Sequence, residues 1–443
     1  MTTVSTIAAL ATAPGAGAVA VIRLSGPEAR IILNRIFKPQ GSPEPWPPRR
    51  LRRGRLIHPS SRRFLDDALA VWFPGPHSFT GEDSAEIQGH GGVAVSALAL
   101  EAVLAAGAEL AQPGEFTKRA FLNGRIDLAQ AEAVADLVAA RSAAETGLAV
   151  RQLAGGLSAR VEEIAASLLA VLADLEAAID FSEETPDSAA LRARLGLEIL
   201  PRLADLLAAG RAGLPFRHGL KVTLAGAPNV SKSSLFNALL GRGRALVSPR
   251  PGTTRDYLTA ETAWSGLRVE LSDTAGLTKA PLDELDELGQ ARSREQMAEA
   301  DLVLWVRDCA APHESGVSPP GRTLAVWNKA DLAPPPPAAA SELAVSARTG
   351  LNLSQLKAAA IKLATGLENP EPPEVAPSLR HQAALSRAEE YLKAALAALG
   401  EGQPPDICAF ELRSAVDALG LIRGRTTAED ILNEVFSRFC LGK

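Results

Sequence analysis

Eight consecutive residues near the middle of the chain have the composition of a phosphate-binding loop. They read Gly226-Ala-Pro-Asn-Val-Ser-Lys-Ser233, and an apolar helical pattern follows them. Backbone N–H groups at the start of a helix hold phosphate oxygens. A lysine at the place of Lys232 reaches the outer phosphates, and a hydroxyl at the place of Ser233 binds magnesium. The segment predicts a nucleotide site with one departure, because Ser231 occupies the place of the second glycine.

Three further motifs follow in the order that a guanine-nucleotide site requires. Asp273-Thr-Ala-Gly276 offers a carboxylate that acts on magnesium through water and a glycine N–H that senses the γ-phosphate. Asn328-Lys-Ala-Asp331 offers a carboxylate that accepts two N–H groups from one edge of guanine, a pattern that adenine does not present. Ser346-Ala-Arg348 follows another short apolar run. Together these motifs predict a guanine-nucleotide-binding domain.

A candidate switch segment lies between the first two motifs. It reads Gly252-Thr-Thr-Arg-Asp256, and Thr254 is the natural second hydroxyl ligand for magnesium in the triphosphate state. Leu277 stands where Ras-like enzymes have a glutamine that orients water. Hydrolysis therefore needs another arrangement. Asn229 has a side-chain oxygen for a monovalent cation, which would bring the positive charge that an arginine finger otherwise supplies.

Strand and helix patterns alternate around these motifs. Four apolar runs are typical of strands in a mostly parallel, doubly wound sheet: Lys221–Ala225, Leu267–Leu271, Leu302–Val306 and Thr323–Trp327. This α/β domain interrupts two helical blocks, which we expect to pack together: Ile126 to about Leu214, broken at Gly155–Gly156, and Leu379 to the end. The last helix is predicted to begin at Thr426, with Glu429 completing a capping box.

The first part of the chain has a different pattern. Ala18–Leu24 and Ala68–Phe73 are typical of strands and Ser96–Ala106 of a helix, which indicates a small α+β domain. The stretch Gly41–Pro48 is interpreted as a surface loop. His90, among glycines, is interpreted as a loop or hydrogen-bonding residue, since no second metal ligand lies near it. Five arginines form a basic cluster that is usually a solvated face, with a phosphate-contacting strip as the alternative: Arg49, Arg50, Arg52, Arg53 and Arg55.

Composition sets outer bounds. The 443 residues predict two to four domains, and the net charge of −5 excludes a globally basic protein that coats nucleic acid. The 3 cysteines are too few for a disulfide framework or a cysteine-rich zinc site. No run of about 18 uncharged apolar residues and no signal-type segment is present. We therefore expect a soluble, cytoplasmic protein.

At this point the chain resembles a known family over essentially its full length. The family is that of the tRNA uridine-5-carboxymethylaminomethyl modification GTPases, MnmE or TrmE. The resemblance rests on the nucleotide motifs and on these segments: Gly15-Ala-Gly17, Arg23-Leu-Ser-Gly26, Phe73-Pro-Gly-Pro-His-Ser-Phe-Thr-Gly-Glu-Asp83, Gln88-Gly-His-Gly-Gly92, Pro113-Gly-Glu-Phe116, Phe121-Leu-Asn-Gly-Arg-Ile-Asp-Leu-Ala-Gln-Ala-Glu132 and Phe439-Cys-Leu-Gly-Lys443.

The resemblance implies a multidomain fold, α/β plus all-α. Residues 1–118 would form an N-terminal α+β domain that binds tetrahydrofolate and dimerises. Residues 119–215 and 373–443 would form a split helical domain, and 216–368 an inserted Ras-like P-loop GTPase domain. The implied activity is potassium-activated GTP hydrolysis, coupled to modification of carbon 5 of the wobble uridine of certain tRNAs. The implied partners are a second copy of the chain, tRNA and the flavoprotein MnmG, which carries the FAD, in a heterotetramer.

Cofactors and site residues come with the resemblance. Mg²⁺ would bind Ser233 and Thr254, and K⁺ would bind Asn229, Ser248, Arg250 and Thr253. The one-carbon donor, 5,10-methylene- or 5-formyl-tetrahydrofolate, would contact Arg23, Glu82, Arg125 and Lys443. Asp286 and Cys440 would be catalytic, although from the residues alone Cys440 is equally a half-buried apolar helix residue. GTP would contact Asn229, Val230, Ser231, Lys232, Ser233, Ser234, Ser248, Pro249, Arg250, Pro251, Gly252, Thr253, Thr254, Asp273, Thr274, Ala275, Gly276, Asn328, Lys329, Ala330, Asp331, Ser346, Ala347 and Arg348.

The chain departs from the family pattern at three places. Ser231 replaces a glycine, Asp286 stands where the family has its catalytic glutamate, with Glu284 and Glu287 nearby, and Arg125 replaces a lysine. The first two keep a second hypothesis open, that of a folate-binding scaffold whose G domain hydrolyses GTP weakly. A ribosome-assembly GTPase is the other alternative, but it would not explain the segment from Phe73 to Gly92 or the C-terminal Cys-Leu-Gly-Lys.

Overall fold

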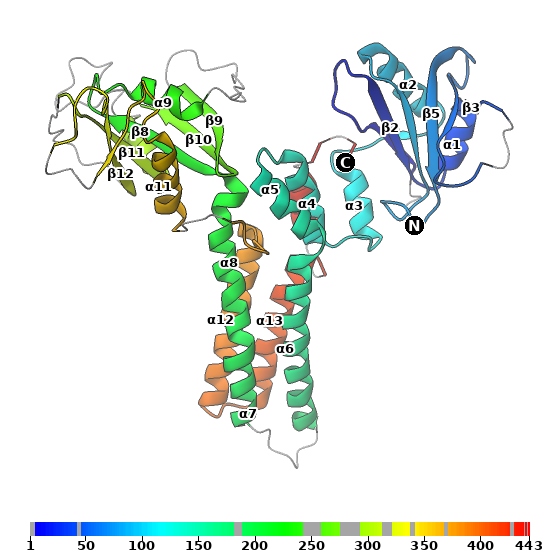
Figure 1. Cartoon of the computed structure of the whole chain (residues 1–443). Coiled ribbons are helices and arrows are strands. Elements are labelled where there is room, and N and C mark those ends of the chain that lie inside the picture. Colours follow the sequence, from blue (N-terminus) through cyan, green and yellow to red (C-terminus); the bar gives the residue numbers. More distant parts are fainter. Residues whose placement is uncertain are drawn as a thin grey trace. The chain divides into compact units, whose positions relative to one another are not determined.

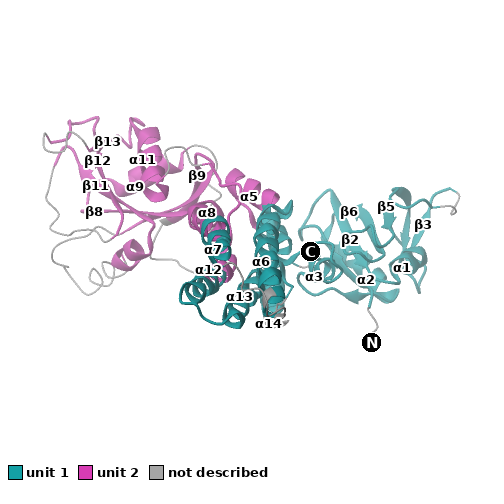
Figure 2. Ribbon diagram, turned by 90° about the horizontal axis from the view of Figure 1, so that it is seen from below, with its two compact units in different colours: residues 1–138, 152–199, 387–443 teal, residues 139–151, 200–386 magenta. Residues whose placement is uncertain are grey.

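The computed structural model describes residues 5–41, 46–180, 188–241, 258–274, 293–311, 321–336, 342–366, 371–425, 429–437, 439–440 and 442–443. The chain divides into two compact units (Figure 2). Unit 1 comprises residues 1–138, 152–199 and 387–443, and unit 2 comprises 139–151 and 200–386. No helix in the described ranges is long and apolar enough to cross a membrane.

Unit 1 begins with a seven-stranded sheet in the order β3-β4-β5-β6-β2-β1-β7. Its strands are β1 (Ile7–Leu10), β2 (Val19–Ser25), β3 (Phe37–Pro39), β4 (Arg52–Ile57), β5 (Phe64–Phe73), β6 (Ser84–His90) and β7 (Glu109–Leu110). All neighbours pair antiparallel except β1 and β7. Helices α1 (Ala29–Ile36) and α2 (Val93–Ala105) share one apolar core with the sheet, which includes Ile22, Leu24, Ile32 and Val103.

The N-terminal predictions are confirmed in type, with longer bounds. The run 18–24 is β2, the run 68–73 is the end of β5, and the helix predicted over 96–106 begins at Val93. The arginine cluster leads into β4, a strand that was not predicted. Arg53 and Arg55 are exposed there, as expected of a solvated face, whereas the Arg52 guanidinium lies 5.9 Å from the ring centroid of Trp46.

The remaining helices of unit 1 connect distant parts of the chain (Figure 1). They are α3 (Glu115–Leu122), α4 (Leu128–Ala139), α6 (Gly156–Asp180), α7 (Ser188–Ala193), a π-helical turn (Arg194–Ile199), α13 (Pro405–Arg423) and α14 (Glu429–Ser437). Ion pairs join α6 to α13, Glu176 with Arg413 and Glu162 with Arg423. Near the C-terminus, Val435, Phe436 and Phe439 pack against Leu128 and Ala131.

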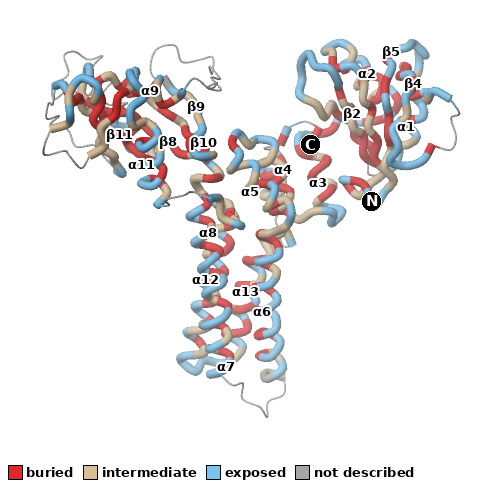
Figure 3. The backbone as a smooth tube through the Cα atoms, in the orientation of Figure 1, coloured by how far each residue is buried: buried red, intermediate tan, exposed pale blue. Residues whose placement is uncertain are grey.

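The two helical blocks therefore pack together as expected. The break predicted at Gly155–Gly156 is also confirmed, because α5 ends at Leu153 and α6 begins at Gly156. Figure 3 shows buried residues at intervals along α6 and α13, as one packed face of each helix requires. Thr426, the predicted first residue of the last helix, lies outside the described residues. The domain boundaries 1–118, 119–215, 216–368 and 373–443 stay predictions.

Unit 2 is built on a six-stranded sheet in the order β13-β12-β11-β8-β10-β9. Its strands are β8 (Leu220–Gly226), β9 (Leu258–Trp264), β10 (Leu267–Asp273), β11 (Leu302–Asp308), β12 (Thr323–Asn328) and β13 (Leu343–Ala344). The four strands predicted here are confirmed. All pairs are parallel except β9 with β10. The helices are α5 (Ala143–Leu153), α8 (Leu200–His218), α9 (Lys232–Leu240), α11 (Leu353–Thr365) and the first third of α12 (Leu379–Gly400), whose remainder belongs to unit 1.

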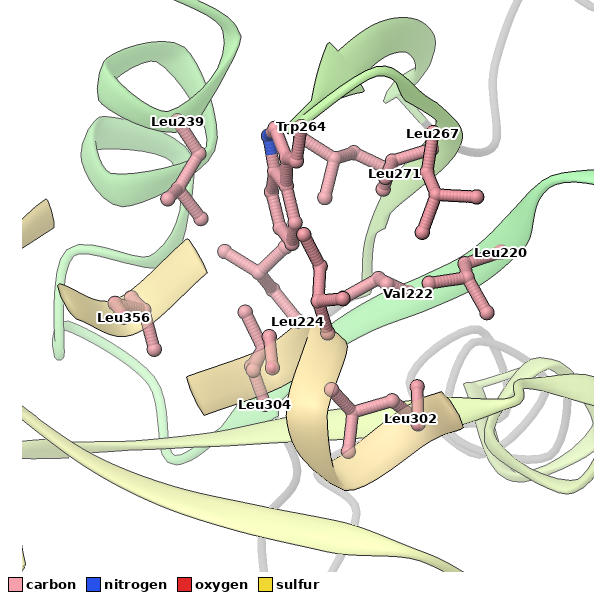
Figure 4. Packing of buried hydrophobic residues seen from close by; sticks show 14 of the residues in the cluster. Leu220, Val222, Leu224, Leu239, Trp264, Leu267, Leu271, Leu302, Leu304 and Leu356 are labelled. Atoms are coloured by element: carbon pink, nitrogen blue, oxygen red, sulfur yellow. The ribbon is translucent and has the colours of Figure 1, made fainter. Parts of the chain in front are cut away.

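Apolar side chains from one side of this sheet form the largest part of its core (Figure 4). Leu220, Val222 and Leu224 of β8 pack with Leu302 and Leu304 of β11, and the ring of Trp264 is almost fully buried beside them. Parallel strands in one sheet bring their carboxyl ends to the same edge. The core therefore holds the ends of β8, β10, β11 and β12 in fixed register.

The β9–β10 hairpin is tied to the start of α5 by charged side chains. Arg268 on β10 lies 2.9 Å from the Glu145 carboxylate, and Arg141 donates to Glu261 on β9 at 2.7 Å. Glu145 has only 9% of its side chain exposed, so water screens the pair with Arg268 weakly. Because β10 ends at Asp273, these pairs help to position a predicted magnesium-site residue.

Candidate nucleotide site

The phosphate-binding loop leaves β8 at a glycine that no other residue can replace easily. A Cβ on Gly226 would lie 2.3 Å from the carbonyl oxygen of Val306 on β11. Two later residues, Asn229 and Ser231, have left-handed backbone conformations with φ of 67° and 63°. Asparagine tolerates this region better than serine does. Ser231, which stands in place of a glycine, is therefore strained in this loop.

Lys232 is buried at the first turn of α9. Its Nζ donates to the carbonyl oxygens of Ala227, at 3.0 Å, and Gly226, at 3.3 Å. Burial lowers the pKa of the Lys232 ammonium, and the negative charge of Asp273 partly offsets this effect. The loop thus encloses the cation that would meet the outer phosphates.

Ser233 and Asp273 meet where the magnesium site is predicted. The Ser233 hydroxyl donates to Asp273 Oδ2 at 2.5 Å, and Asp273 Oδ1 is buried with no hydrogen-bond partner among the described residues. Burial raises the pKa of Asp273, while the Ser233 hydrogen bond and the Lys232 charge act in the opposite direction. A hydroxyl beside a carboxylate with an unsatisfied oxygen suits a hard cation with water ligands. These residues therefore fit Mg²⁺.

The predicted guanine-binding residues come together at the ends of β12 and β13. The Ser346 hydroxyl donates to Asp331 Oδ1 at 2.6 Å, and the Ala347 N–H donates to Asn328 Oδ1 at 3.1 Å. The Asn328 amide donates in turn to the Val230 carbonyl oxygen at 3.2 Å. Asn328 therefore links the base side of the site to the phosphate loop, and Ser346 fixes the orientation of the Asp331 carboxylate.

Asp308 is a site residue that the sequence interpretation missed. It accepts from Lys329 Nζ at 2.5 Å, and Lys329 also donates to the Asn229 carbonyl oxygen at 3.2 Å. Burial favours the neutral form of Asp308, but the hydrogen bonds from Lys329 and the Ala310 N–H outweigh it and lower the pKa of Asp308. The sequence indicates Asp308 only by its place at the end of a predicted strand. The structure adds that Asp308 lies opposite Asn328 in the register of β11 and β12.

Other predicted nucleotide residues lie in or near the same place. Thr274 donates through its hydroxyl to the Leu224 carbonyl oxygen at 2.9 Å, while Ser234 and Arg348 are exposed. Lys329 is followed by Ala330, whose N–H donates to Val345. Several predicted residues lie outside the described residues: Ser248, Pro249, Arg250, Pro251, Gly252, Thr253, Thr254, Ala275, Gly276 and Asp286.

Two of the predicted folate residues, Arg23 on β2 and Glu82 just before β6, are held in ion pairs. Arg23 lies 2.9 Å from Glu86 Oε1. Glu82 accepts from the Ser25 hydroxyl at 2.7 Å and from Arg119 at 3.1 Å. Glu86 and Arg119 were missed in the sequence, because the pairs join residues 63 and 37 positions apart.

The other predicted N-terminal and C-terminal site residues lie near the same sheet. The side chain of Arg125 is close to Gly81, where an added Cβ would lie 3.3 Å from Arg125 Cγ. Lys443 follows Gly442, which lies against the carbonyl of Leu10 at the end of β1. Cys440 is an exposed free thiol beyond the end of α14, so its interpretation as a half-buried helix residue is wrong.

Replacing Ser231 by glycine is expected to tighten GTP binding about tenfold. The side chain at φ 63° costs about 1–2 kcal/mol, which glycine does not pay. Isothermal titration with GTP measures the change. Ser265 is the matched control, because it is a serine at φ 47° in the β9–β10 turn. Ser265→Gly should raise thermal stability without changing GTP affinity, and equal affinity gains in both variants would contradict the argument.

Comparison with known proteins places this chain in a family. The family model described as the MnmE helical domain matches residues 128–440, and the model described as the GTP-binding protein TrmE N-terminus matches residues 6–125. Among solved structures, the G domain of the T. maritima FeoB iron transporter is 26% identical, covers 33% of this chain and 98% of that chain, and has a TM-score of 0.27.

Curated relatives match along the whole chain. The protein named tRNA modification GTPase MnmE from Roseiflexus castenholzii is 40% identical over 478 residues, and the protein of that name from Chloroflexus aurantiacus is 44% identical over 456 residues. A third, from a Methylobacterium species, is 45% identical over 448 residues. In each case the match covers 99% of this chain and 99% of the relative. The chain therefore belongs to the MnmE family of tRNA modification GTPases.

Proposed function

We propose that this GTPase hydrolyses GTP in a potassium-dependent manner while it acts with the flavoprotein MnmG on tRNA. The product would be a carboxymethylaminomethyl or aminomethyl group on carbon 5 of the wobble uridine, with a folate as the one-carbon donor. The observation that carries the GTPase half is the group formed by Lys232, Ser233 and Asp273, in which one buried cation, one hydroxyl and one unsatisfied carboxylate oxygen converge.

Each residue of this group has a distinct role in the proposal. Lys232 would bind the outer phosphates, and Ser233 and Thr254 would hold Mg²⁺, which supplies positive charge against the developing phosphate charge. Asp273 would orient the water ligands of that ion. Asp331, held by Ser346, would select guanine. Asp286 would orient the attacking water, in the place of the family's glutamate.

Potassium would replace an arginine finger. Asn229 is exposed on the phosphate loop, so its side-chain oxygen can reach a cation. Lys329 Nζ donates to the backbone carbonyl oxygen of Asn229 and not to its side chain. Ser248, Arg250 and Thr253 would complete the ligand set. A monovalent cation beside the transferring phosphate lowers the barrier as an oriented positive charge does.

GTP turnover is expected to be severalfold faster in potassium than in sodium at equal ionic strength. The proposed oxygen ligands, Asn229 among them, would bind the larger potassium ion in preference to sodium. Steady-state phosphate release by the full-length protein measures this, and Asn229→Ala should abolish the difference. Equal turnover in both salts would favour the second candidate, a folate-binding scaffold with a weakly hydrolysing G domain.

The scaffold candidate has a specific observation behind it. Ser231 stands at φ 63° within the phosphate loop, where strain works against nucleotide binding. The decisive experiment is the modification state of wobble uridines in cells that lack the protein. Rescue by wild type but not by Lys232→Ala supports a GTPase role, and rescue by both supports the scaffold.

The folate half of the proposal rests on N-terminal residues. Arg23, Glu82, Arg125 and Lys443 offer the cations and carboxylate that suit a ligand with glutamate carboxylates and a pterin edge. The exposed thiol of Cys440 would take part in the modification chemistry. The protein would act as a homodimer through its N-terminal domain, in a heterotetramer with MnmG, in the cytoplasm.

A further inference from the structure

Positive charge is concentrated at one edge of the N-terminal sheet, where α1 continues into β3 and β3 pairs with β4. The segment from Ala29 to Arg63 contains ten lysine and arginine residues and one acidic residue, Glu44, although the whole chain has 46 basic and 51 acidic residues. All ten except Arg30 and Arg52 are exposed. Protein surfaces usually intersperse charges of both signs. We call the exposed cations of this segment the basic edge.

Strand register places cations of the basic edge directly opposite each other. Lys38 of β3 pairs with Arg55 of β4, and Arg53 lies two residues from Arg55 on the same face of that strand. Like charges directly opposite each other on antiparallel strands destabilise a sheet. Within the described part of the chain, Arg53 alone of these exposed cations has an acidic partner, Asp67 at 3.2 Å, and both side chains of that pair are exposed. Most of the positive charge is therefore uncompensated.

A hollow of about 490 Å³ continues the basic edge onto the outer face of α1. Arg35 and Lys38 line it from the end of α1 and from β3, and Arg62 lines it from the turn between β4 and β5. Its other lining residues in the described ranges are Ile31, Asn34 and Pro59, none of which is acidic. Because Lys38 belongs to the hollow and also pairs with Arg55, the basic surface is continuous around the β3 edge.

We propose that the basic edge binds the sugar–phosphate backbone of tRNA. The inference rests on the tRNA function proposed above. Nine of the ten basic residues in the segment are arginines. Arginine suits phosphate because its planar guanidinium donates two parallel hydrogen bonds to the phosphate oxygens. Such contacts orient a nucleic acid without reading its sequence, so this edge would hold the body of the tRNA and not the wobble base.

Phe64 gives the basic edge a second means of contact with RNA. Its ring is 54% exposed at the start of β5, and the Arg55 guanidinium lies 5.9 Å from the ring centroid. Unpaired RNA bases stack on exposed aromatic rings and on arginine planes. An acidic protein surface would need only the charges. The exposed ring beside Arg55 therefore favours RNA over an acidic protein as the partner.

Fluorescence anisotropy with a labelled, unmodified tRNA transcript tests the basic edge in the full-length protein. The double variant Arg55→Gln/Arg62→Gln is expected to weaken tRNA binding about tenfold and to reduce the slope of log affinity against log salt by about 2. Its thermal unfolding temperature should not fall, because Arg55 lies against an exposed ring and Arg62 lines an open hollow. The matched control is Arg202→Gln/Arg211→Gln, which removes the same charge at exposed positions of α8 and should change neither quantity.

The assembled reaction with MnmG gives a second measurement. The variant Arg55→Gln/Arg62→Gln is expected to raise the KM for tRNA severalfold and to leave kcat unchanged, because backbone contacts bind the substrate and the transition state equally. The control variant should keep both constants at the wild-type values.

Each other result overturns a defined part. If wild-type protein with MnmG leaves the wobble uridine unmodified, the proposed function fails, and this inference fails with it. If modification occurs but the wild type alone does not bind tRNA, or Arg55→Gln/Arg62→Gln binds it as tightly as the wild type, the basic edge is not an RNA surface and the function stands. Equal weakening in both double variants would mean that net charge alone governs binding. Weaker MnmG binding or a changed sedimentation coefficient, with unchanged tRNA affinity, would assign the edge to a protein interface and overturn the inference.

Discussion

Lys232→Ala is expected to lower GTP affinity or turnover by about 10²–10³-fold. The Lys232 ammonium is enclosed by the carbonyls of Gly226 and Ala227, so it is already positioned for the phosphates before they arrive. Burial lowers its pKa, which means that the surroundings favour the cation less than water does. A bound triphosphate would place negative charge beside the buried ammonium. The binding energy of the triphosphate therefore depends on this interaction with Lys232.

Two measurements check this expectation. Titration with a non-hydrolysable GTP analogue gives the affinity, and phosphate release gives the turnover. Lys221→Ala is the matched control, because Lys221 is an exposed lysine at the start of β8 and its replacement removes the same charge outside the nucleotide site. Thermal unfolding of both variants separates loss of binding from loss of fold. GTP affinity within a factor of about three of wild type would show that another cation binds the outer phosphates.

The strands around this site could be predicted because their local signals agree. The runs that become β8, β10, β11 and β12 are short, apolar and separated by helical patterns, so periodicity and connection length give the same answer. The strand β4 escaped prediction because its sequence, Arg-Arg-Gly-Arg-Leu-Ile, has the composition of a solvated segment. Its arginines are tolerated because Arg53 and Arg55 lie on the open face of the sheet and Arg52 lies over an aromatic ring.

The sequence could predict the motif residues of the proposed nucleotide site, but not the hydrogen bonds that connect them. Motif spacing places Asn328 and Asp331 after a strand, yet the bond from Asn328 to Val230 depends on how that strand lies beside β8. The same holds for Asp308, which has no motif of its own and acquires a role only because β11 and β12 end together.

Asp331→Asn is expected to weaken GTP by about 10²-fold or more and to admit xanthosine triphosphate. Ser346 donates to Asp331 Oδ1, and an asparagine can keep this bond through its own oxygen. Its amide nitrogen then takes the place of Oδ2 and faces the base. Guanine presents N–H donors at this edge. The asparagine NH₂ group is also a donor, so it cannot form a hydrogen bond with them. Xanthine has a carbonyl in place of the exocyclic amine and accepts from the amide instead.

Competition between the two triphosphates in one turnover assay measures this exchange. Asp301→Asn is the matched control, because the Asp301 carboxylate accepts from the Lys221 backbone N–H and has no part in the nucleotide site. The altered base preference also allows a test of whether tRNA modification depends on the nucleotide bound to this protein. If Asp331→Asn modifies tRNA only when xanthosine triphosphate is supplied, modification requires the nucleotide in this site. Unchanged preference for GTP in Asp331→Asn would mean that Asn328 and the Ala347 N–H select guanine without the carboxylate, and that Ser346 holds Asp331 for a structural purpose alone.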